Sequence, residues 1–299
     1  MSDAEPAIIV HGGAWNIPDE AWPPHREGCL AAVRAGYAEL ARGASALDAV
    51  IAAVRFLEDD PTFDAGFGSV LGRDGYPEMD AGLMDGAGLR FGGVVGVRRF
   101  ANPVLLARAV LEDGSHCLLS GEGAELFARE RCFPECDPES LILDRERENW
   151  ERYRREGFDL AEKFRRPRET AGAVALDSRG DLAAGNSTGG VSFKHPGRVG
   201  DSALPGCGLY ADNRSGACCC SGWGEQIMRL VLAKGVVDDL GRGLTVGKAA
   251  DAALARLGRF EGGRAGLILL TPAGETAAFH NTPRMAWASL GPRGEQAAE

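Results

Sequence analysis

The sequence predicts a layered α+β fold, in which sheets pack on each other and helices lie outside them. Two observations support this expectation: segments with strand patterns occur in blocks, and segments with helical patterns are grouped between those blocks. We find no internal repeat in the 299 residues, a length that suits one large domain or two ordinary ones. Length and the absence of a repeat leave both possibilities open.

The first part of the chain alternates strand and helix patterns. The continuous apolar run Ala7–Val10 predicts a buried strand, and a helix is expected at about 24–40. A clearer helix begins at Ser45, which can form a capping box with Asp48, and ends before Pro61. Its apolar residues recur at three- and four-residue steps: Leu47, Val50, Ile51, Val54 and Leu57. Further elements are expected at 93–97 (strand), 104–111 (helix), 117–120 (strand) and 122–131 (helix).

Residues 137–169 differ in composition from the rest of the chain. The run from Asp144 to Glu169 is dense in charges of both signs, which favours a solvated helix followed by a linker. Acidic residues are interleaved with the basic ones, so the run is not typical of a nucleic-acid-binding segment. We therefore interpret 137–169 as a charged linker.

From Thr170 onward, strand and helix patterns return. Two apolar runs on either side of Ser178-Arg179-Gly180 predict a hairpin of 173–176 with 182–184. The remaining expected elements are strands at 208–211 and 216–221, helices at 225–234 and 246–257, a second hairpin of 267–270 with 276–279, and a strand at 285–290.

Composition and charge argue against several classes of function. A total of 33 Lys and Arg against 43 Asp and Glu gives a net charge of −10, which disfavours binding to nucleic acid. No apolar run approaches the roughly 18 residues of a membrane span, and the N-terminus lacks the basic region of a signal peptide. We expect a cytoplasmic protein with no nucleic-acid or membrane partner, in which the eight cysteines are reduced. Neither Cys132-x3-Cys136 nor Cys218-Cys219-Cys220 has the spacing of a metal site.

Thr170 is the strongest candidate for a nucleophile. The nucleophile-elbow motif of α/β-hydrolases is absent, and none of the five histidines has an obvious triad partner in the sequence. Thr170 directly follows the charged linker and begins an apolar strand. If the Glu169–Thr170 bond is cleaved, the new α-amine, with a pKa of about 7.7–8.0, can deprotonate the hydroxyl of the same residue. The alternative interpretation is an ordinary strand residue.

Three later segments can complete a site around this threonine. Asn186-Ser187-Thr188-Gly189-Gly190 is a loop of small polar residues. Arg198 and Asp201 lie three residues apart in a glycine-bounded loop, where they can bind the carboxylate and the ammonium of an amino acid, or simply form a surface ion pair. Ser221-Gly222-Trp223-Gly224-Glu225 leads into a helix, whose first N–H groups can stabilise an oxyanion or serve only as a cap.

Together, and in this order, these segments resemble the plant-type asparaginase/isoaspartyl peptidase family of N-terminal-nucleophile hydrolases, which is related to glycosylasparaginase. In the second half, the motifs that carry the resemblance are 170–177, 187–190, 197–202, 210–212 and 222–225. In the first half, they are His11-Gly12-Gly13-Ala14-Trp15, Ala65-Gly66-x-Gly68, Met84-Asp85-Gly86, Asn102-Pro103 and Gly121-Glu122-Gly123-Ala124. The resemblance covers about 7–130 and 170–290, but not the linker.

The resemblance implies a fold, a maturation step and an assembly. The fold is a single catalytic domain over residues 1–299, a four-layer αββα sandwich of the N-terminal-nucleophile hydrolase type. Autocleavage between Glu169 and Thr170 gives an α chain, 1–169, and a β chain, 170–299, and two cleaved protomers form a homodimer. No organic cofactor is implied, but a structural Na⁺ is, held by backbone carbonyls of Leu57, Glu58, Phe63, Ala65 and Phe67.

The resemblance also assigns roles to individual residues. Thr170 is the nucleophile, Thr188 supports it and assists self-cleavage, and Gly222 lines the oxyanion hole with Ser221. The resemblance further implies that Arg198 holds the α-carboxylate of the substrate's aspartyl group and that Asp201 holds its α-amine. Thr170 attacks the side-chain amide or β-peptide carbonyl, giving a β-aspartyl ester that water then hydrolyses.

Three residues depart from the family pattern. Ser221 stands where the family usually has Thr, so the hydroxyl is kept and the methyl is lost. Asp64 stands where asparaginases usually have Asn, which places an anion near the substrate. Glu169 precedes the nucleophile where asparaginases have Gly, and we expect this residue to slow self-cleavage.

The predicted reaction is therefore hydrolysis of the β-aspartyl amide or isopeptide bond of asparagine or isoaspartyl dipeptides. Ser187–Gly190 favours this branch of the family. Because Ala184–Asn186 and Val191–Lys194 also resemble glycosylasparaginases, hydrolysis of N-glycosyl-asparagine is the alternative. A second alternative is an uncleaved, non-catalytic protein that binds an amino acid, in keeping with the three departures from the family pattern.

Overall fold

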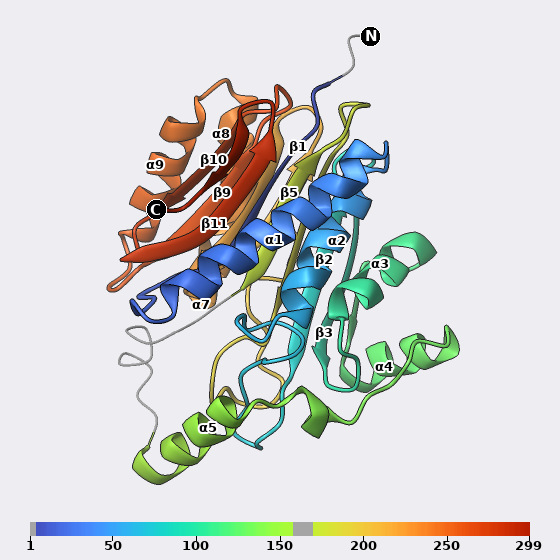
Figure 1. Ribbon diagram of the computed structural model, residues 1–299, viewed down its shortest axis with the longest axis vertical. Coiled ribbons are helices and arrows are strands. Elements are labelled where there is room, and N and C mark those ends of the chain that lie inside the picture. Colours follow the sequence, from blue (N-terminus) through green and yellow to red (C-terminus); the bar gives the residue numbers. More distant parts are fainter. Residues whose placement is uncertain (1–3, 158–169) are drawn as a thin grey trace.

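The computed structural model describes residues 4–157 and 170–299, and in these residues the strands form two sheets (Figure 1). The strands of the larger sheet are β1 (Ala7–Trp15), β2 (Met79–Asp85), β3 (Arg90–Val97), β4 (Leu118–Ser120), β5 (Ala171–Leu176), β6 (Leu182–Thr188), β11 (Arg284–Gly291) and β12 (Gly294–Ala297). Their order is β12-β11-β1-β5-β6-β2-β3-β4. The smaller sheet consists of β7 (Leu209–Asp212), β8 (Gly216–Gly222), β9 (Ala265–Leu270) and β10 (Thr276–His280), in the order β10-β9-β8-β7.

Helices cover the outer face of each sheet. The larger sheet carries α1 (Trp22–Ala41), α2 (Ala46–Asp59), α3 (Pro103–Asp113) and α4 (Gly121–Glu130). The smaller sheet carries α7 (Gly224–Leu230), α8 (Leu232–Gly241) and α9 (Val246–Leu257). Figure 1 shows α1 and α2 on one side of the stacked strands and α8 and α9 on the other. The expected αββα sandwich is therefore confirmed.

The two-residue period of the strands divides their side chains between the layers. In β5, Ala173 and Ala175 join the core beneath the helices, whereas Val174 and Leu176 join the core between the sheets. The three consecutive cysteines follow the same rule in β8: Cys219 faces the core between the sheets, and its two neighbours face the helices. The described residues contain no cluster of three or more His, Cys, Asp and Glu that could hold a metal.

Helix α2 shows how closely the local signals match the structure. The Ser45 hydroxyl accepts a hydrogen bond from the Asp48 N–H, and the Asp48 carboxylate accepts one from the Ser45 N–H, so the predicted capping box is present. The apolar face of the helix contacts β5, which the candidate nucleophile directly precedes, and β6, which ends at Thr188.

Three elements differ from the sequence prediction. Strands β2 and β12 were not predicted, and the helix expected at 225–234 is divided into α7 and α8 at Val231, whose φ is +49°. The division has a tertiary cause: the N–H groups of Ala233 and Lys234 donate to the carbonyls of Cys207 and Gly206, at 3.1 and 2.9 Å. The first turn of α8 is therefore directed onto the 206–207 loop instead of continuing α7.

The charged segment is described as far as Gly157. It contains a short 3₁₀ helix, η1 (Pro138–Leu141), and then α5 (Asp144–Glu156), which agrees with the expected solvated helix. The rest of the predicted linker, including Glu169, lies outside the described residues. None of the helices in 4–157 and 170–299 combines the length and apolar composition that crossing a bilayer requires.

Candidate active site

The hydroxyl of Thr170 lies among two other hydroxyl groups. Thr170 directly precedes β5 and is 9% exposed. Its Oγ1 donates to Thr188 Oγ1 at 3.4 Å and lies 3.4 Å from Ser202 Oγ. Thr188 is the last residue of β6, so the β5–β6 hairpin brings the two threonines together, and its Oγ1 accepts a hydrogen bond of 2.9 Å from the Gly190 N–H. We call Thr170, Thr188 and Ser202 the hydroxyl cluster.

Arg198 and Asp201 meet at the start of α7. A Cβ on Gly224 would lie 2.7 Å from Asp201 Oδ1 and 2.9 Å from Arg198 Nη2, so the glycine leaves the space between the two charged groups open. Arg198 forms its ion pair with Glu225, at 2.9 Å. Oδ2 of Asp201 is buried and has no hydrogen-bond partner in the described part of the chain. The arrangement therefore offers the guanidinium of Arg198 to the carboxylate of a ligand and a carboxylate oxygen of Asp201 to the ammonium of the same ligand.

Burial raises the pKa of Asp201 to about 7, and the charge of Arg198 opposes this rise. The carboxyl is 5% exposed, so its ionised form is poorly solvated. A substrate ammonium beside Asp201 would favour the ionised form. An ammonium bound at this position and ionisation of the carboxyl would therefore favour each other.

Ser221 and Gly222 end strand β8. The Ser221 hydroxyl accepts a hydrogen bond of 3.2 Å from the Ala14 N–H, which ties it to β1. Gly222 has a φ of +155°, and a Cβ there would lie 2.4 Å from the carbonyl oxygen of Arg264. The Trp223 N–H donates to that same carbonyl at 3.1 Å, so it is not available to an oxyanion. Gly222 and Ser221 therefore remain the candidates for the oxyanion hole, as the resemblance implies.

Asp64 lies against the turn that follows Thr188. Its backbone carbonyl accepts a hydrogen bond from the Gly189 N–H at 2.9 Å, and its Oδ1 accepts one from the Val70 N–H at 2.8 Å. A Cβ on Gly189 would lie 2.0 Å from Asp64 Oδ1, so only glycine fits there. The structure thus places the Asp64 carboxylate beside Gly189, the residue that follows Thr188 of the hydroxyl cluster.

A buried lysine and a buried aspartate behind the cluster were not predicted. Asp80 is the pairing partner of Thr188 between β2 and β6. Lys194 Nζ donates to the carbonyl of Gly189 at 2.9 Å. Burial lowers the pKa of Lys194 and raises that of Asp80, and the attraction between the two charges opposes both shifts. Lys194 and Asp80 come from segments whose meeting no local pattern in the sequence indicates, whereas Ser202 directly follows Asp201 in the glycine-bounded loop already identified from the sequence.

His11 lies behind the nucleophile in neutral form. It is fully buried, and burial lowers its pKa to about 4. In the sheet it is paired with Gly172, which is paired in turn with Asn186. A Cβ on Gly172 would lie 2.3 Å from His11 Nε2 and 2.2 Å from Asn186 Oδ1, so this glycine lets the two polar side chains approach each other beside Thr170.

The carbonyls expected to hold Na⁺ lie where α2 ends and the chain turns back. The carbonyl of Glu58 accepts a hydrogen bond from the Phe67 N–H at 2.8 Å, which closes the loop. The Glu58 side chain is fully buried, and within the described residues its Oε2 has no hydrogen-bond partner. Burial raises the pKa of Glu58 to about 8. A carboxyl in this setting fits a nearby cation, which would favour its ionised form.

Comparison with known proteins agrees with this arrangement. The family model described as asparaginase matches residues 4–297. The chain is 43% identical over 287 residues to an isoaspartyl peptidase/L-asparaginase of Xenopus laevis, covering 96% of this chain and 92% of the relative. It is 41% identical over 285 residues to the human protein of the same name, covering 95% and 92%. A plant-type L-asparaginase of Pyrococcus furiosus is 42% identical over 299 residues, covering 95% and 96%.

Proposed function

Because the chain belongs to the asparaginase family, we propose that it hydrolyses the β-aspartyl amide bond of asparagine and of isoaspartyl dipeptides, with Thr170 as the nucleophile. The single observation that carries this proposal is the hydroxyl cluster. It places a buried threonine at the start of a strand, 3.4 Å from Thr188, and next to Asp201 through the neighbouring Ser202. The names of the relatives given above support the same chemistry.

Each step of the reaction can be assigned to a group of this chain. Arg198 binds the α-carboxylate of the substrate and Asp201 its α-ammonium, which directs the side-chain carbonyl toward Thr170. The α-amine of Thr170 takes the hydroxyl proton as Oγ1 attacks that carbonyl carbon, and the proton is passed to the leaving nitrogen as the C–N bond breaks. Water then cleaves the β-aspartyl ester and regenerates the hydroxyl.

This chemistry requires a free α-amine, and thus cleavage of the Glu169–Thr170 bond. Thr188 supports the proposed self-cleavage, since it accepts the hydrogen bond of the attacking hydroxyl. The products are an α chain of residues 1–169 and a β chain of 299 − 169 = 130 residues. We place the cleaved protein in the cytoplasm, in keeping with eight free thiols, and infer a homodimer with a structural Na⁺ on the carbonyls of the 57–67 loop.

The first test is the intact mass of the purified protein after incubation at neutral pH. We expect two fragments, the smaller beginning at Thr170, and a single full-length species for Thr170→Ala. The cleaved protein should then hydrolyse asparagine and a β-aspartyl dipeptide, whereas the uncleaved Thr170→Ala variant should hydrolyse neither. A wild-type chain that stays intact for days and binds aspartate without turnover would replace this proposal with the non-catalytic alternative.

Hydrolysis of N-glycosyl-asparagine is the second candidate function, favoured by the segments 184–186 and 191–194. It uses the same nucleophile and differs only in the leaving group. Parallel assays with N-glycosyl-asparagine and a β-aspartyl dipeptide separate the two candidates, because only the former requires space for a sugar.

A further inference from the structure

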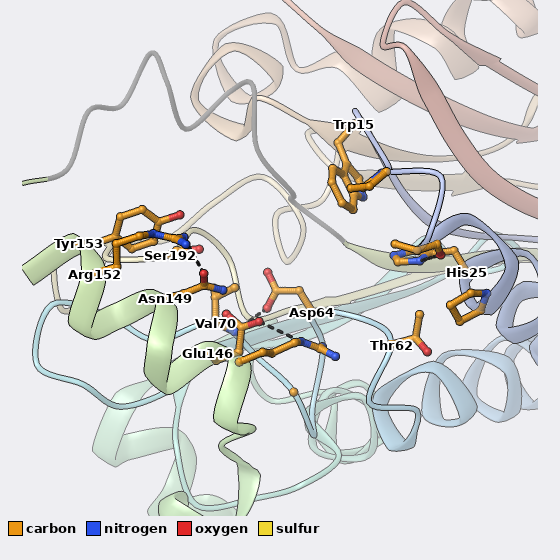
Figure 2. Close-up of a pocket in the computed structure, with 15 residues that line it drawn as sticks. Trp15, His25, Thr62, Asp64, Val70, Glu146, Asn149, Arg152, Tyr153 and Ser192 are labelled. Carbon is orange, nitrogen blue, oxygen red and sulfur yellow. Dashed lines mark hydrogen bonds and ion pairs between the residues drawn. The ribbon is translucent and has the colours of Figure 1, made fainter. Parts of the chain in front are cut away.

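A cavity of about 350 Å³ lies between the N-terminal part of the chain and α5. This volume is at the lower end of the range for small-molecule sites, roughly 300–1,000 Å³. In Figure 2, Trp15 and His25 form one side of the cavity, Arg152 and Tyr153 of α5 form the opposite side, and Asp64 lies between them. We call this space the α5 cavity.

Two contacts connect the α5 cavity to the candidate active site. Asp64 lines the cavity and also lies against Gly189, the residue that follows Thr188. Trp15 lines it as well, and the preceding residue, Ala14, donates its N–H to Ser221. The cavity therefore adjoins the hydroxyl cluster on the side of Asp64 and Ser221.

The wall formed by the end of β1 and the start of α1 is apolar and aromatic. Pro18, Ala21 and Pro24 line it together with Trp15. The Trp15 ring is held by an edge contact with His25, whose ring centroid is 5.9 Å away. Trp15 is only 6% exposed, and its Nε1–H has no acceptor in the described residues. This wall suits a large apolar or aromatic side chain, with one donor left for a polar atom.

The opposite wall carries a guanidinium with an unused donor. Arg152 Nη2 donates to Asn149 Oδ1 at 2.6 Å, and the guanidinium lies over the Tyr153 ring at 5.1 Å. The buried Nε–H of Arg152 has no acceptor in the described part of the chain. The other arginine of the cavity, Arg145, is engaged by Glu146 at 3.1 Å. Arg152 is therefore the group placed to receive a carboxylate.

We propose that the α5 cavity binds the leaving amino acid of an isoaspartyl dipeptide, with a large apolar side chain against Trp15 and its free carboxylate at Arg152. This inference rests on the proposed function, since it concerns the part of the substrate beyond the scissile bond. Asparagine releases only ammonia and leaves the cavity unused. The site is thus shaped for a dipeptide with a bulky second residue.

Four substrates test this assignment on the purified, cleaved protein: β-aspartyl-phenylalanine, its C-terminal amide, β-aspartyl-glycine and asparagine. Burial of a phenylalanine side chain should raise kcat/KM about tenfold or more over the glycine dipeptide. Trp15→Ala should reduce that ratio toward one. Both substrates are measured on the same variant, so a loss of folded protein cancels from the ratio.

The carboxylate contact has its own test. Arg152→Gln should lower kcat/KM for β-aspartyl-phenylalanine about tenfold relative to asparagine, because a charge-assisted hydrogen bond is lost. The C-terminal amide lacks the carboxylate, so Arg152→Gln should not lower its kcat/KM relative to asparagine. Arg154→Gln is the matched control, since Arg154 lies on the same helix with its guanidinium over the Trp150 ring, at 5.1 Å.

The outcomes separate this inference from the function on which it rests. If asparagine is hydrolysed but neither Trp15→Ala nor Arg152→Gln changes the relative kcat/KM values of the dipeptides, the assignment of the α5 cavity to the leaving amino acid is overturned. The proposed function then remains intact. No cleavage of the chain and no turnover of any substrate overturns the proposed function. Faster turnover of N-glycosyl-asparagine than of β-aspartyl-phenylalanine assigns the cavity to a sugar instead.

Discussion

At the scale of single residues, the raised pKa of Asp201 should make the proposed binding of the substrate ammonium depend on pH. The carboxyl is buried, its pKa is about 7, and it is proposed to bind the substrate ammonium only when ionised. Because the pKa is raised, the protonated form accumulates as the pH falls through 7. The bound ammonium lowers this pKa again, so the change belongs to binding more than to chemistry.

We therefore expect KM for asparagine to rise below pH 7, approaching tenfold per pH unit, while Asp201 contributes no such change to kcat. Titration of the Thr170 α-amine would instead affect kcat, which allows the two groups to be told apart. Initial rates between pH 5.5 and 8.5 measure both profiles. A KM that stays constant over this range would remove Asp201 from ammonium binding.

The residues of the candidate site were predictable to the extent that local motifs carry them. The place of Thr170 between a charged linker and an apolar strand, and the spacing of Arg198 and Asp201 in a glycine-bounded loop, made these residues candidates. Only the resemblance to the family favoured a catalytic or binding role for them over a structural one. Lys194 and Asp80 were missed because each looks like an ordinary polar residue of its own segment. Only the pairing of β2 with β6 and the approach of Lys194 to Gly189 bring them behind Thr188.

At the scale of elements, Lys194 stabilises the turn after β6, and its charge is attracted to that of the buried Asp80. Lys194 holds the Gly189 carbonyl, and both charged groups are buried. Removing one partner leaves the other charge buried without compensation, whereas removing both does not.

Lys194→Met should lower the free energy of unfolding by about 3–5 kcal/mol. Adding Asp80→Asn in the same chain should restore a large part of that loss, even though a second polar contact has been altered. Urea denaturation of the wild type, both single variants and the double variant measures the coupling. Additive losses would mean that the two charges do not act on each other.

Elements with a strong period were predicted well, and those shaped by tertiary contacts were not. Helix α2 has its capping box and its apolar face in the sequence, and the structure confirms both. Strand β2 was missed because Met79–Asp85 is nearly all buried and mixes Asp, Gly and Met, without the alternation that marks a half-buried strand. The division at Val231 depends on carbonyls of residues 206 and 207, which no helical pattern reveals.

At the scale of the whole molecule, the two proposed chains are interleaved within one sheet. Strands β5 and β6, from the second chain, lie between β1 and β2 of the first. Strand β11, also from the second chain, pairs with the other edge of β1. Three strand pairings, β11 with β1, β1 with β5, and β6 with β2, therefore cross between the chains, and each faces a buried core.

Cleavage at residue 169 should consequently leave the native assembly intact. The two fragments cannot separate without breaking the hydrogen bonds of these pairings and exposing the apolar cores on both faces of the larger sheet to water, and both changes oppose dissociation. We expect the cleaved protein to elute in size-exclusion chromatography at the same volume as uncleaved Thr170→Ala, and to give two bands only under denaturing conditions. Elution of the 130-residue fragment by itself in native buffer would contradict the interleaved sheet order. Retention of both fragments in one peak would mean that the strand pairings between the chains hold Thr170 and its new N-terminus in place after the chain is cut.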